Sequence, residues 1–196
     1  MPIIIGADEV GYGALAGPVV VCGVRAATGW SMDGLNDSKK LSEKKRLLMR
    51  SKLKEHIDNG IIMAHIAERS ATEIDKVGIA VALKDAYAEC FKILDYYFDD
   101  DVQIIVDGVL KFDNINPDDY DIKSVVKADT KIPTVMAASI LAKTYRDEKM
   151  KELHLLHPQY NWIKNVGYGS ATHLKAIAEM GPSPLHRYSY APMKNM

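Results

Sequence analysis

An apolar run that ends in two adjacent acids, Asp8 and Glu9, constrains this chain more than any other feature. The run is Ile3-Ile4-Ile5, whose β-branched side chains favour a buried strand. Glycines at 11, 13 and 17 then predict a turn, and the apolar residues 19–24 predict a returning strand. Ionised carboxylates resist leaving water unless they are paired or bind a metal. The two acids therefore mark either an exposed strand end or a divalent-cation site.

A cation site that uses both acids requires a particular backbone conformation. Consecutive residues of a strand face opposite sides of the sheet. For Asp8 and Glu9 to converge on one ion, we expect the chain to turn sharply at about residues 10–13, where Gly11 and Gly13 make such a turn easy.

The remaining elements alternate between strands and helices. Apolar runs predict further strands at 61–66, 102–106 and 122–126. Ser42 is the expected N-cap of a helix, and a capping box at 72–75 is expected to open one long helix whose apolar stripe runs from Ile79 to Tyr97. Tyr87 and Tyr97 on that stripe are assigned to core packing. Two more helices are expected, from Pro133 to about 150 and from Ser170 to Met180.

Two later strands also end in acids. Asp107 follows the fourth predicted strand, and Asp129 lies just beyond the fifth. Sites in α/β sheets gather at the carboxyl ends of strands, so these acids are expected to meet Asp8 and Glu9 there. Clustered carboxylates raise one another's pKa or bind cations. Their oxygens suit Mg²⁺ or Mn²⁺, and the usual reaction of such a site is in-line phosphoryl displacement.

Composition sets the broad class. The 196 residues, with 47% hydrophobic and 26% charged residues, are typical of a soluble globular chain. We expect a catalytic core over residues 1–150 and a helical segment with an extended tail over 151–196, packed on the same domain. No membrane span and no signal peptide are expected, because the initial apolar run has only three residues. Cys22 and Cys90, in apolar surroundings, are expected to be reduced and buried in a cytoplasmic protein.

Charge is distributed unevenly although the net charge is only −1. Residues 85–121 carry eleven acids against two lysines, whereas residues 143–196 carry eight basic residues against four acids. This asymmetry permits an anionic partner on one face without requiring one.

Eight stretches in this order resemble the ribonuclease HII (type-2 ribonuclease H) family over nearly the whole chain: GADEVGYGALAGPVVVCGV, LNDSKKLSEKKR, ATEIDKVGI, VDG, KADTKIPTVMAASILAKTYRD, HPQY, GYGSATH and GPSPLHR. The resemblance implies a ribonuclease H-like α/β fold, a five-stranded mixed sheet with three antiparallel and then two parallel strands, flanked by helices, with a helical C-terminal part. It implies a monomeric endonuclease that cuts the RNA strand of RNA–DNA hybrids and ribonucleotides embedded in duplex DNA, leaving 3′-hydroxyl and 5′-phosphate ends.

The resemblance also assigns roles to residues. Asp8, Glu9, Asp107 and Asp129 fall on the family's four metal-binding carboxylates. Tyr168 falls on a tyrosine that stacks on the sugar beside the ribonucleotide, and Lys39 and Lys40 fall on a basic element that contacts phosphate.

The chain departs from its family in one turn. Family members usually carry Gly-Arg-Gly where this chain has Gly11-Tyr12-Gly13, and in the family that turn contacts the ribose 2′-hydroxyl largely through its backbone. Because that hydroxyl distinguishes RNA from DNA, the change bears on recognition more than on catalysis. A type-3 relative is disfavoured, because the chain has no room for that type's extra N-terminal domain.

Other interpretations of these motifs are weaker. The glycines of residues 11–17 could form a dinucleotide loop, but acids directly before it would repel a pyrophosphate. His154 and His157 could bind a metal, but they lack partner ligands and are assigned to a solvent-facing helix. His173 and His186 are assigned structural or nucleic-acid-adjacent positions. Without the resemblance, residues 39–46 would be a solvated helix face. A non-catalytic hybrid-binding domain of the same fold is the alternative function, and four intact carboxylates argue against it.

Overall fold

Five strands form one mixed sheet. This computed structural model describes residues 2–95, 102–108 and 121–196. The strands are β1 (Ile3–Val10), β2 (Val19–Ala27), β3 (Met63–Arg69), β4 (Val102–Asp107) and β5 (Asp121–Val125). Their order across the sheet is β3-β2-β1-β4-β5. Strands β1 to β3 pair antiparallel, while β4 runs parallel to both β1 and β5. The predicted five-stranded mixed sheet is thereby confirmed.

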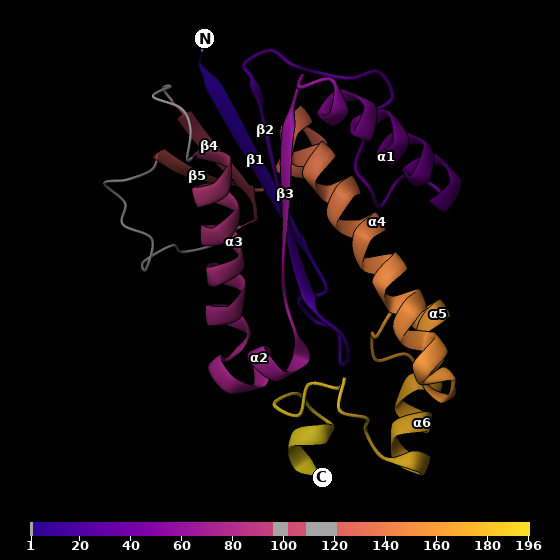
Figure 1. The fold of residues 1–196 in the computed structure, drawn as a ribbon. Coiled ribbons are helices and arrows are strands. Elements are labelled where there is room, and N and C mark those ends of the chain that lie inside the picture. Colours follow the sequence, from indigo (N-terminus) through magenta and orange to yellow (C-terminus); the bar gives the residue numbers. More distant parts are fainter. Residues whose placement is uncertain (1, 96–101, 109–120) are drawn as a thin grey trace.

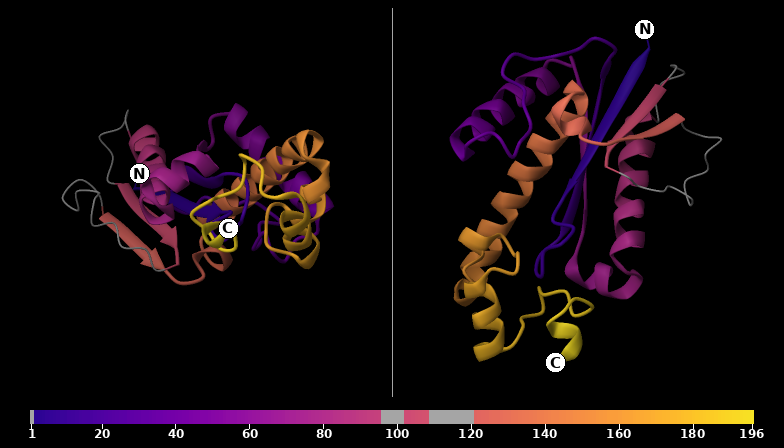
Figure 2. Two further views of the ribbon diagram at one scale, coloured as in Figure 1. Left: turned by 90° about the horizontal axis from the view of Figure 1, so that it is seen from below. Right: turned by 180° about the vertical axis from the view of Figure 1, so that it is seen from behind.

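Helices cover both faces of the sheet (Figures 1 and 2). The α-helices of the described residues are α1 (Glu43–Asp58), α2 (Ala71–Val77), α3 (Ile79–Asp95), α4 (Pro133–Leu156), α5 (Trp162–Asn165) and α6 (Ala171–Met180), and short 3₁₀ turns are η1 (Ala128–Thr130), η2 (Pro158–Tyr160) and η3 (Met193–Asn195). Helix α3 packs on β2 and β3 from one side, and α4 packs on β1 and β2 from the other with α1 beside it. None of the described helices is long and apolar enough to cross a membrane.

Alternation along the strands divides the core into two layers. Ile5, Ala7 and Val21 face α3 and join its buried side chains, including Tyr87 and Phe91. Val20, Cys22 and Val24 face the other way, onto α1 and α4. Each strand residue therefore belongs to one layer or the other, and this parity decides where the acids point. Both cysteines are free and buried, as predicted.

Strand β1 ends at Val10, one residue beyond the acidic pair in which it was expected to end. The structure corrects two other local predictions. The capping box is formed by Ser70 and Glu73, two residues earlier than predicted. The predicted long helix is two helices, because Gly78 adopts a φ of 84° that interrupts the helical backbone. Tyr97 and the Asp- and Asn-rich loop at 109–120 lie outside the described residues.

The C-terminal segment packs against the turn that follows β1. Met150, Trp162 and Ile177 share a buried cluster with Leu15 and Ala16. Helix α4 crosses residue 150 without interruption, and the division of the chain at that residue stays a prediction. His154 and His157 are half-buried rather than solvent-facing, because the ring of His157 packs 5.7 Å from that of Trp162.

Candidate active site

Asp8 and Glu9 leave β1 on opposite faces of the sheet. Asp8 is buried on the α4 side, where the Ser139 hydroxyl hydrogen-bonds to it. Glu9 turns toward α3, where the fully buried Tyr87 donates its hydroxyl to Glu9 Oε2 at 2.5 Å. The sharp turn begins only at Gly11, which has a φ of 90°, and does not redirect Glu9. The strand's alternation thus persists through the acidic pair.

Asp107 organises the next part of the site. It is the last residue of β4, and its Oδ1 accepts the Ala128 N–H at 2.7 Å. This bond holds the start of η1, which carries the buried Asp129. In strand parity Asp107 lies on the same face as Ile105, which packs with Ala128 and Val135. Asp8, Asp107 and Asp129 therefore belong to the α4 face, and Glu9 to the other.

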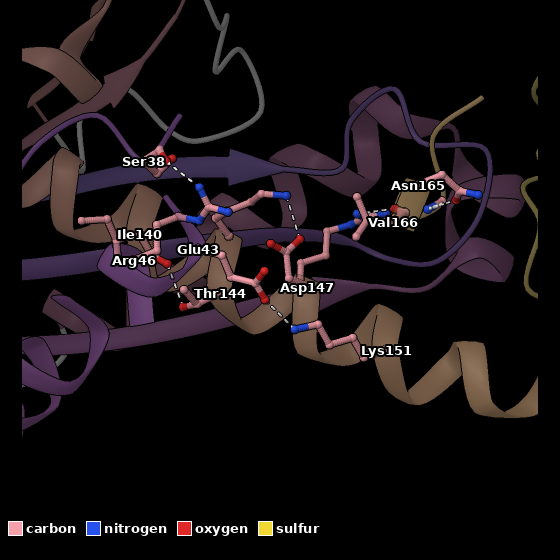
Figure 3. A network of polar contacts seen from close by, with 12 residues as sticks. Ser38, Glu43, Arg46, Ile140, Thr144, Asp147, Lys151, Asn165 and Val166 are labelled. Carbon is pink, nitrogen blue, oxygen red and sulfur yellow. Dashed lines mark hydrogen bonds and ion pairs between the residues drawn. The ribbon is translucent and has the colours of Figure 1, made fainter. Parts of the chain in front are cut away.

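A lysine reaches into this acidic region from a different segment. Lys39 Nζ lies 3.1 Å from Asp129 Oδ2, although three-quarters of the Lys39 side chain is exposed. Its loop is anchored beside Asp8, because Ser38 Oγ lies 2.8 Å from Ser139 Oγ. Arg46 of α1 donates to the Ser38 carbonyl at 3.1 Å, as Figure 3 shows. Lys39 and Lys40 thus lie in an anchored turn before α1, not on the helix face considered above.

The negative charge of the acidic side chains exceeds the positive charge beside them. Burial, reinforced by the charges of Glu9 and Asp107, raises the pKa of Asp8 to about 7. Burial also raises the pKa of Glu9, although the Tyr87 hydrogen bond opposes this. Burial lowers the pKa of Lys39, but its hydrogen bond to Asp129 and the charges of Asp129 and Asp8 outweigh that effect and raise it. The acids therefore lack a full counter-charge at neutral pH.

A cavity of about 190 Å³ opens beside the two acids of β1. Its lining includes Lys39, Lys143 and Tyr168 as well as Asp8 and Glu9. Lys143 also pairs with Asp147 at 2.7 Å. Carboxylates next to lysines and an aromatic ring suit a ligand that combines phosphate with a flat or sugar surface.

The remaining predicted recognition residues surround this cavity unequally. Tyr168 lies in it, held by a 2.9 Å hydrogen bond between its carbonyl and His173 Nδ1, with its ring centroid 5.5 Å from the Arg146 guanidinium. In the turn after β1, Gly11 is buried while Tyr12 and Gly13 are exposed. Lys40 is exposed and does not line the cavity. His173 and His186 are fully buried, so the structural assignment holds for both.

The donor set fits an oxygen-preferring cation by its chemistry. Four carboxyl groups supply only oxygen, the ligand that Mg²⁺ and Mn²⁺ prefer. Within the described residues, no three acidic, histidine or cysteine side chains are already gathered in coordination geometry. Asp8, Asp107 and Asp129 share one face of the sheet, and Glu9 is turned toward Tyr87 on the other. The excess negative charge of these acids, rather than a preformed coordination geometry, therefore indicates a cation site here.

Sequence reasoning missed several residues that shape this site. Ser139 and Lys143 were assigned only to a close-packed helix, although their i, i+4 spacing places both on one face of α4. Tyr87 was assigned to the core, which is correct, but its hydroxyl also reaches Glu9. Arg146 is fully buried next to Tyr168, and no local signal in the sequence marks it.

Comparisons with known proteins identify the family of this chain. A sequence model of the family described as Ribonuclease HII matches residues 5–193. The chain belongs to the ribonuclease HII family. It is 39% identical over 197 residues to "Ribonuclease HII" of Helicobacter pylori (strain G27), covering 98% of this chain and 93% of that protein. It is 38% identical to the protein of the same name from Chlamydia pneumoniae, covering 99% of this chain and 86% of that one.

Solved structures share the ribonuclease HII fold. Ribonuclease HII in the PCNA complex from Archaeoglobus fulgidus superposes with a TM-score of 0.73 at 25% identity, covering 96% of this chain and 95% of that one. Bst-RNase HIII in complex with Mn²⁺ gives a TM-score of 0.71 at 20% identity and covers 98% of this chain but 68% of that one. The latter likeness concerns the fold alone.

Proposed function

We propose that this protein is an endoribonuclease that hydrolyses the RNA strand of RNA–DNA hybrids and cuts at ribonucleotides embedded in duplex DNA, leaving 3′-hydroxyl and 5′-phosphate ends. The observation that carries the proposal is the group of undercompensated acids, with Asp8 at its centre, in a chain that matches the ribonuclease HII family over residues 5–193. We further propose that the protein acts as a monomer in the cytoplasm.

Asp8, Glu9, Asp107 and Asp129 are the residues that would hold Mg²⁺ or Mn²⁺. When bound at such a site, divalent ions activate water and stabilise charge on the leaving oxygen, most effectively as a pair. The protein's own contribution is to orient these ligands: Ser139 holds Asp8, Tyr87 holds Glu9, and the Ala128 N–H holds Asp107.

The basic and aromatic residues would bind the nucleic acid. Lys39 and Lys143 line the same cavity as the acids, so they can contact phosphates next to the cleaved bond. The half-exposed ring of Tyr168 offers a flat surface for the neighbouring sugar. The turn at Gly11, Tyr12 and Gly13 would contact the ribose 2′-hydroxyl through its backbone. The roles of Lys39, Tyr168 and the turn are carried over from the family resemblance, position by position, whereas the role of Lys143 rests on its place in the cavity.

A cleavage assay on three matched duplexes tests the proposal. The three duplexes share one DNA strand. The other strand is all DNA, all RNA, or DNA with one ribonucleotide, and each duplex is incubated with Mg²⁺, with Mn²⁺ or with EDTA. We expect metal-dependent shortening of only the two ribose-containing strands. Asp107→Asn should lower turnover by orders of magnitude without abolishing hybrid binding. Asp58→Asn, which removes an exposed acid on α1, is the matched control.

Two results would overturn the proposal. Cleavage that persists in EDTA would remove the metal from the reaction. A mobility shift of the hybrid with no shortening in either metal would establish the alternative function, a hybrid-binding domain that does not cut.

A further inference from the structure

Two fully buried arginines, Arg146 and Arg187, connect the turn after β1 to the C-terminal segment. Their hydrogen bonds run to carbonyl oxygens rather than to carboxylates. A buried guanidinium is costly unless its N–H groups are satisfied, so these contacts must be well formed. Burial lowers the pKa of Arg146 to about 10, which leaves it charged at neutral pH.

Arg146 fixes the second half of the turn and the loop of Tyr168. Its Nε donates to the Pro18 carbonyl at 2.9 Å, and its Nη1 donates to the Val166 carbonyl at 2.8 Å. The approach is so close that a Cβ on Gly11 would lie 2.3 Å from Arg146 Nε. The turn after β1 and the loop before α6 are thereby held as one unit.

Arg187 contacts both the beginning and the end of the same turn. Its Nε and Nη2 both donate to the Gly17 carbonyl, at 3.1 and 3.0 Å, and its Nη1 donates to the Tyr12 carbonyl at 2.8 Å. The Tyr190 hydroxyl donates to that same Tyr12 carbonyl at 2.9 Å. The Tyr12 oxygen thus accepts two hydrogen bonds, which is the capacity of a carbonyl.

The orientation of the Tyr12 carbonyl determines the orientation of the next N–H group. In a trans peptide the C=O of one residue and the N–H of the next lie in one plane and point in opposite directions. Since Arg187 and Tyr190 draw the Tyr12 oxygen toward the protein, the Gly13 N–H points away from it. Gly13 is exposed, a Cβ there would meet nothing within 4 Å, and within the described residues its N–H has no protein acceptor.

We propose that Arg187 and Tyr190 are positioning residues that set ribose selectivity, by fixing the peptide between Tyr12 and Gly13 so that the Gly13 N–H is presented to the 2′-hydroxyl. The inference rests on the proposed function, which places the ribose at this turn. Neither residue is proposed to touch the nucleic acid. Both act through the Tyr12 carbonyl, and Tyr12 itself is needed only for its backbone.

Tyr190→Phe is the sharpest test, because it removes one hydroxyl and keeps the ring that packs 5.2 Å from the Arg187 guanidinium. Tyr188→Phe is the control, since the exposed Tyr188 hydroxyl makes only a 3.4 Å contact with the Pro182 carbonyl. Both are made in an Asp107→Asn background, so that affinity is measured without cleavage. The readout is the ratio of Kd values for an all-DNA duplex and for the same duplex with one ribonucleotide.

We expect Tyr190→Phe to lower this ratio roughly fivefold, the factor typical of one neutral hydrogen bond, while Tyr188→Phe leaves it unchanged. Arg187→Lys, which keeps the charge but loses the planar fork, should lower it further. Thermal melting identifies any variant that fails to fold. If Arg187→Lys does not fold, the Kd ratio of Tyr190→Phe alone tests the proposal.

Three other outcomes are distinguishable. If Tyr190→Phe keeps the selectivity of the parent, the positioning role is wrong. If it weakens binding to both duplexes equally, Tyr190 has a structural role and the inference fails. If the parent protein itself does not prefer the duplex with a ribonucleotide, the proposed function fails, and the inference fails with it.

Discussion

Replacing Asp8 by asparagine should make the metal-free protein more stable while abolishing its proposed activity. The Asp8 carboxyl is only 6% exposed, and its pKa is raised from 3.8 to about 7, chiefly by burial. One unit of pKa corresponds to about 1.4 kcal/mol, so the ionised form costs the folded state on the order of 4 kcal/mol at pH 8. Asparagine has similar size and does not ionise, so Asp8→Asn removes this cost.

The raised pKa of Asp8 determines how the stability difference between Asp8→Asn and wild type changes with pH. A carboxyl whose pKa is higher in the folded state binds its proton more tightly there than in the unfolded chain. Its contribution to stability is therefore full below pH 3.8 and is lost as the pH rises toward 7. The advantage of Asp8→Asn should be near zero at pH 4 and should reach about 4 kcal/mol above pH 7, or roughly 8–16 °C in Tm for a chain of this size.

Urea unfolding in EDTA at several pH values measures this difference directly. Asp58→Asn, at an exposed acid paired with Lys54, should change the free energy of unfolding by less than about 1 kcal/mol throughout. At pH 8, Mg²⁺ should reduce the difference in free energy of unfolding between Asp8→Asn and wild type, because an ion that binds only the folded wild type stabilises it. The reasoning is refuted if Asp8→Asn is no more stable than wild type at pH 8, or if its advantage is the same at pH 4.

Three further variants test individual contacts. Tyr87→Phe removes the donor that lowers the pKa of Glu9, so it should destabilise the protein by roughly 1–3 kcal/mol at pH 8 and by less at pH 4, as measured by urea unfolding. Lys39→Ala combined with Lys40→Ala should reduce the slope of log affinity against log salt for a hybrid by about 1–2, and an unchanged slope would leave both lysines in solvent. Tyr12→Arg should raise cleavage at one embedded ribonucleotide more than at a run, because the exposed side chain can be replaced freely and a guanidinium can contact phosphate; equal gains on both substrates would contradict this.

The sheet was predictable because its signal is local. Strands β1, β2 and β4 contain apolar, largely β-branched runs bounded by glycines or acids, and that pattern depends little on the rest of the chain. The helix interrupted at Gly78 shows the limit of such patterns. The sequences of α2 and α3 follow each other as one nearly continuous helical pattern. Only the positive φ of Gly78 separates the two helices.

The parity of the acidic pair was harder to predict. The sequence places Asp8 and Glu9 side by side, which suggests one shared site, but a strand that continues to Val10 turns them to opposite faces. Whether the strand stops before or after the pair depends on its pairing with β2, where Glu9 lies opposite Val21 and Val10 opposite Val20. Such pairing is a tertiary contact, and the turn residues alone do not determine it.

The buried arginines could not be predicted from local sequence, because arginine usually lies on the surface. Arg146 and Arg187 are buried only because α4 and the tail converge on the turn after β1, and that convergence joins residues more than 120 positions apart. The stretches around both residues match the family as sequence, but a match does not reveal which backbone oxygens they bind.

The contrast between these arginines and the acids indicates how the site is kept functional. The arginines are buried charges whose hydrogen bonds are satisfied by fixed carbonyls, so they make the turn rigid. The carboxyls of the buried Asp8 and the half-buried Glu9 lack a sufficient counter-charge, so in their ionised form they oppose folding and favour a cation. The turn that the arginines hold begins at Gly11, two residues after Glu9. A rigid turn beside these acids confines the energetic cost to the ionisation of the carboxyls, and a bound cation would relieve that cost without rearranging the backbone that we propose contacts the ribose.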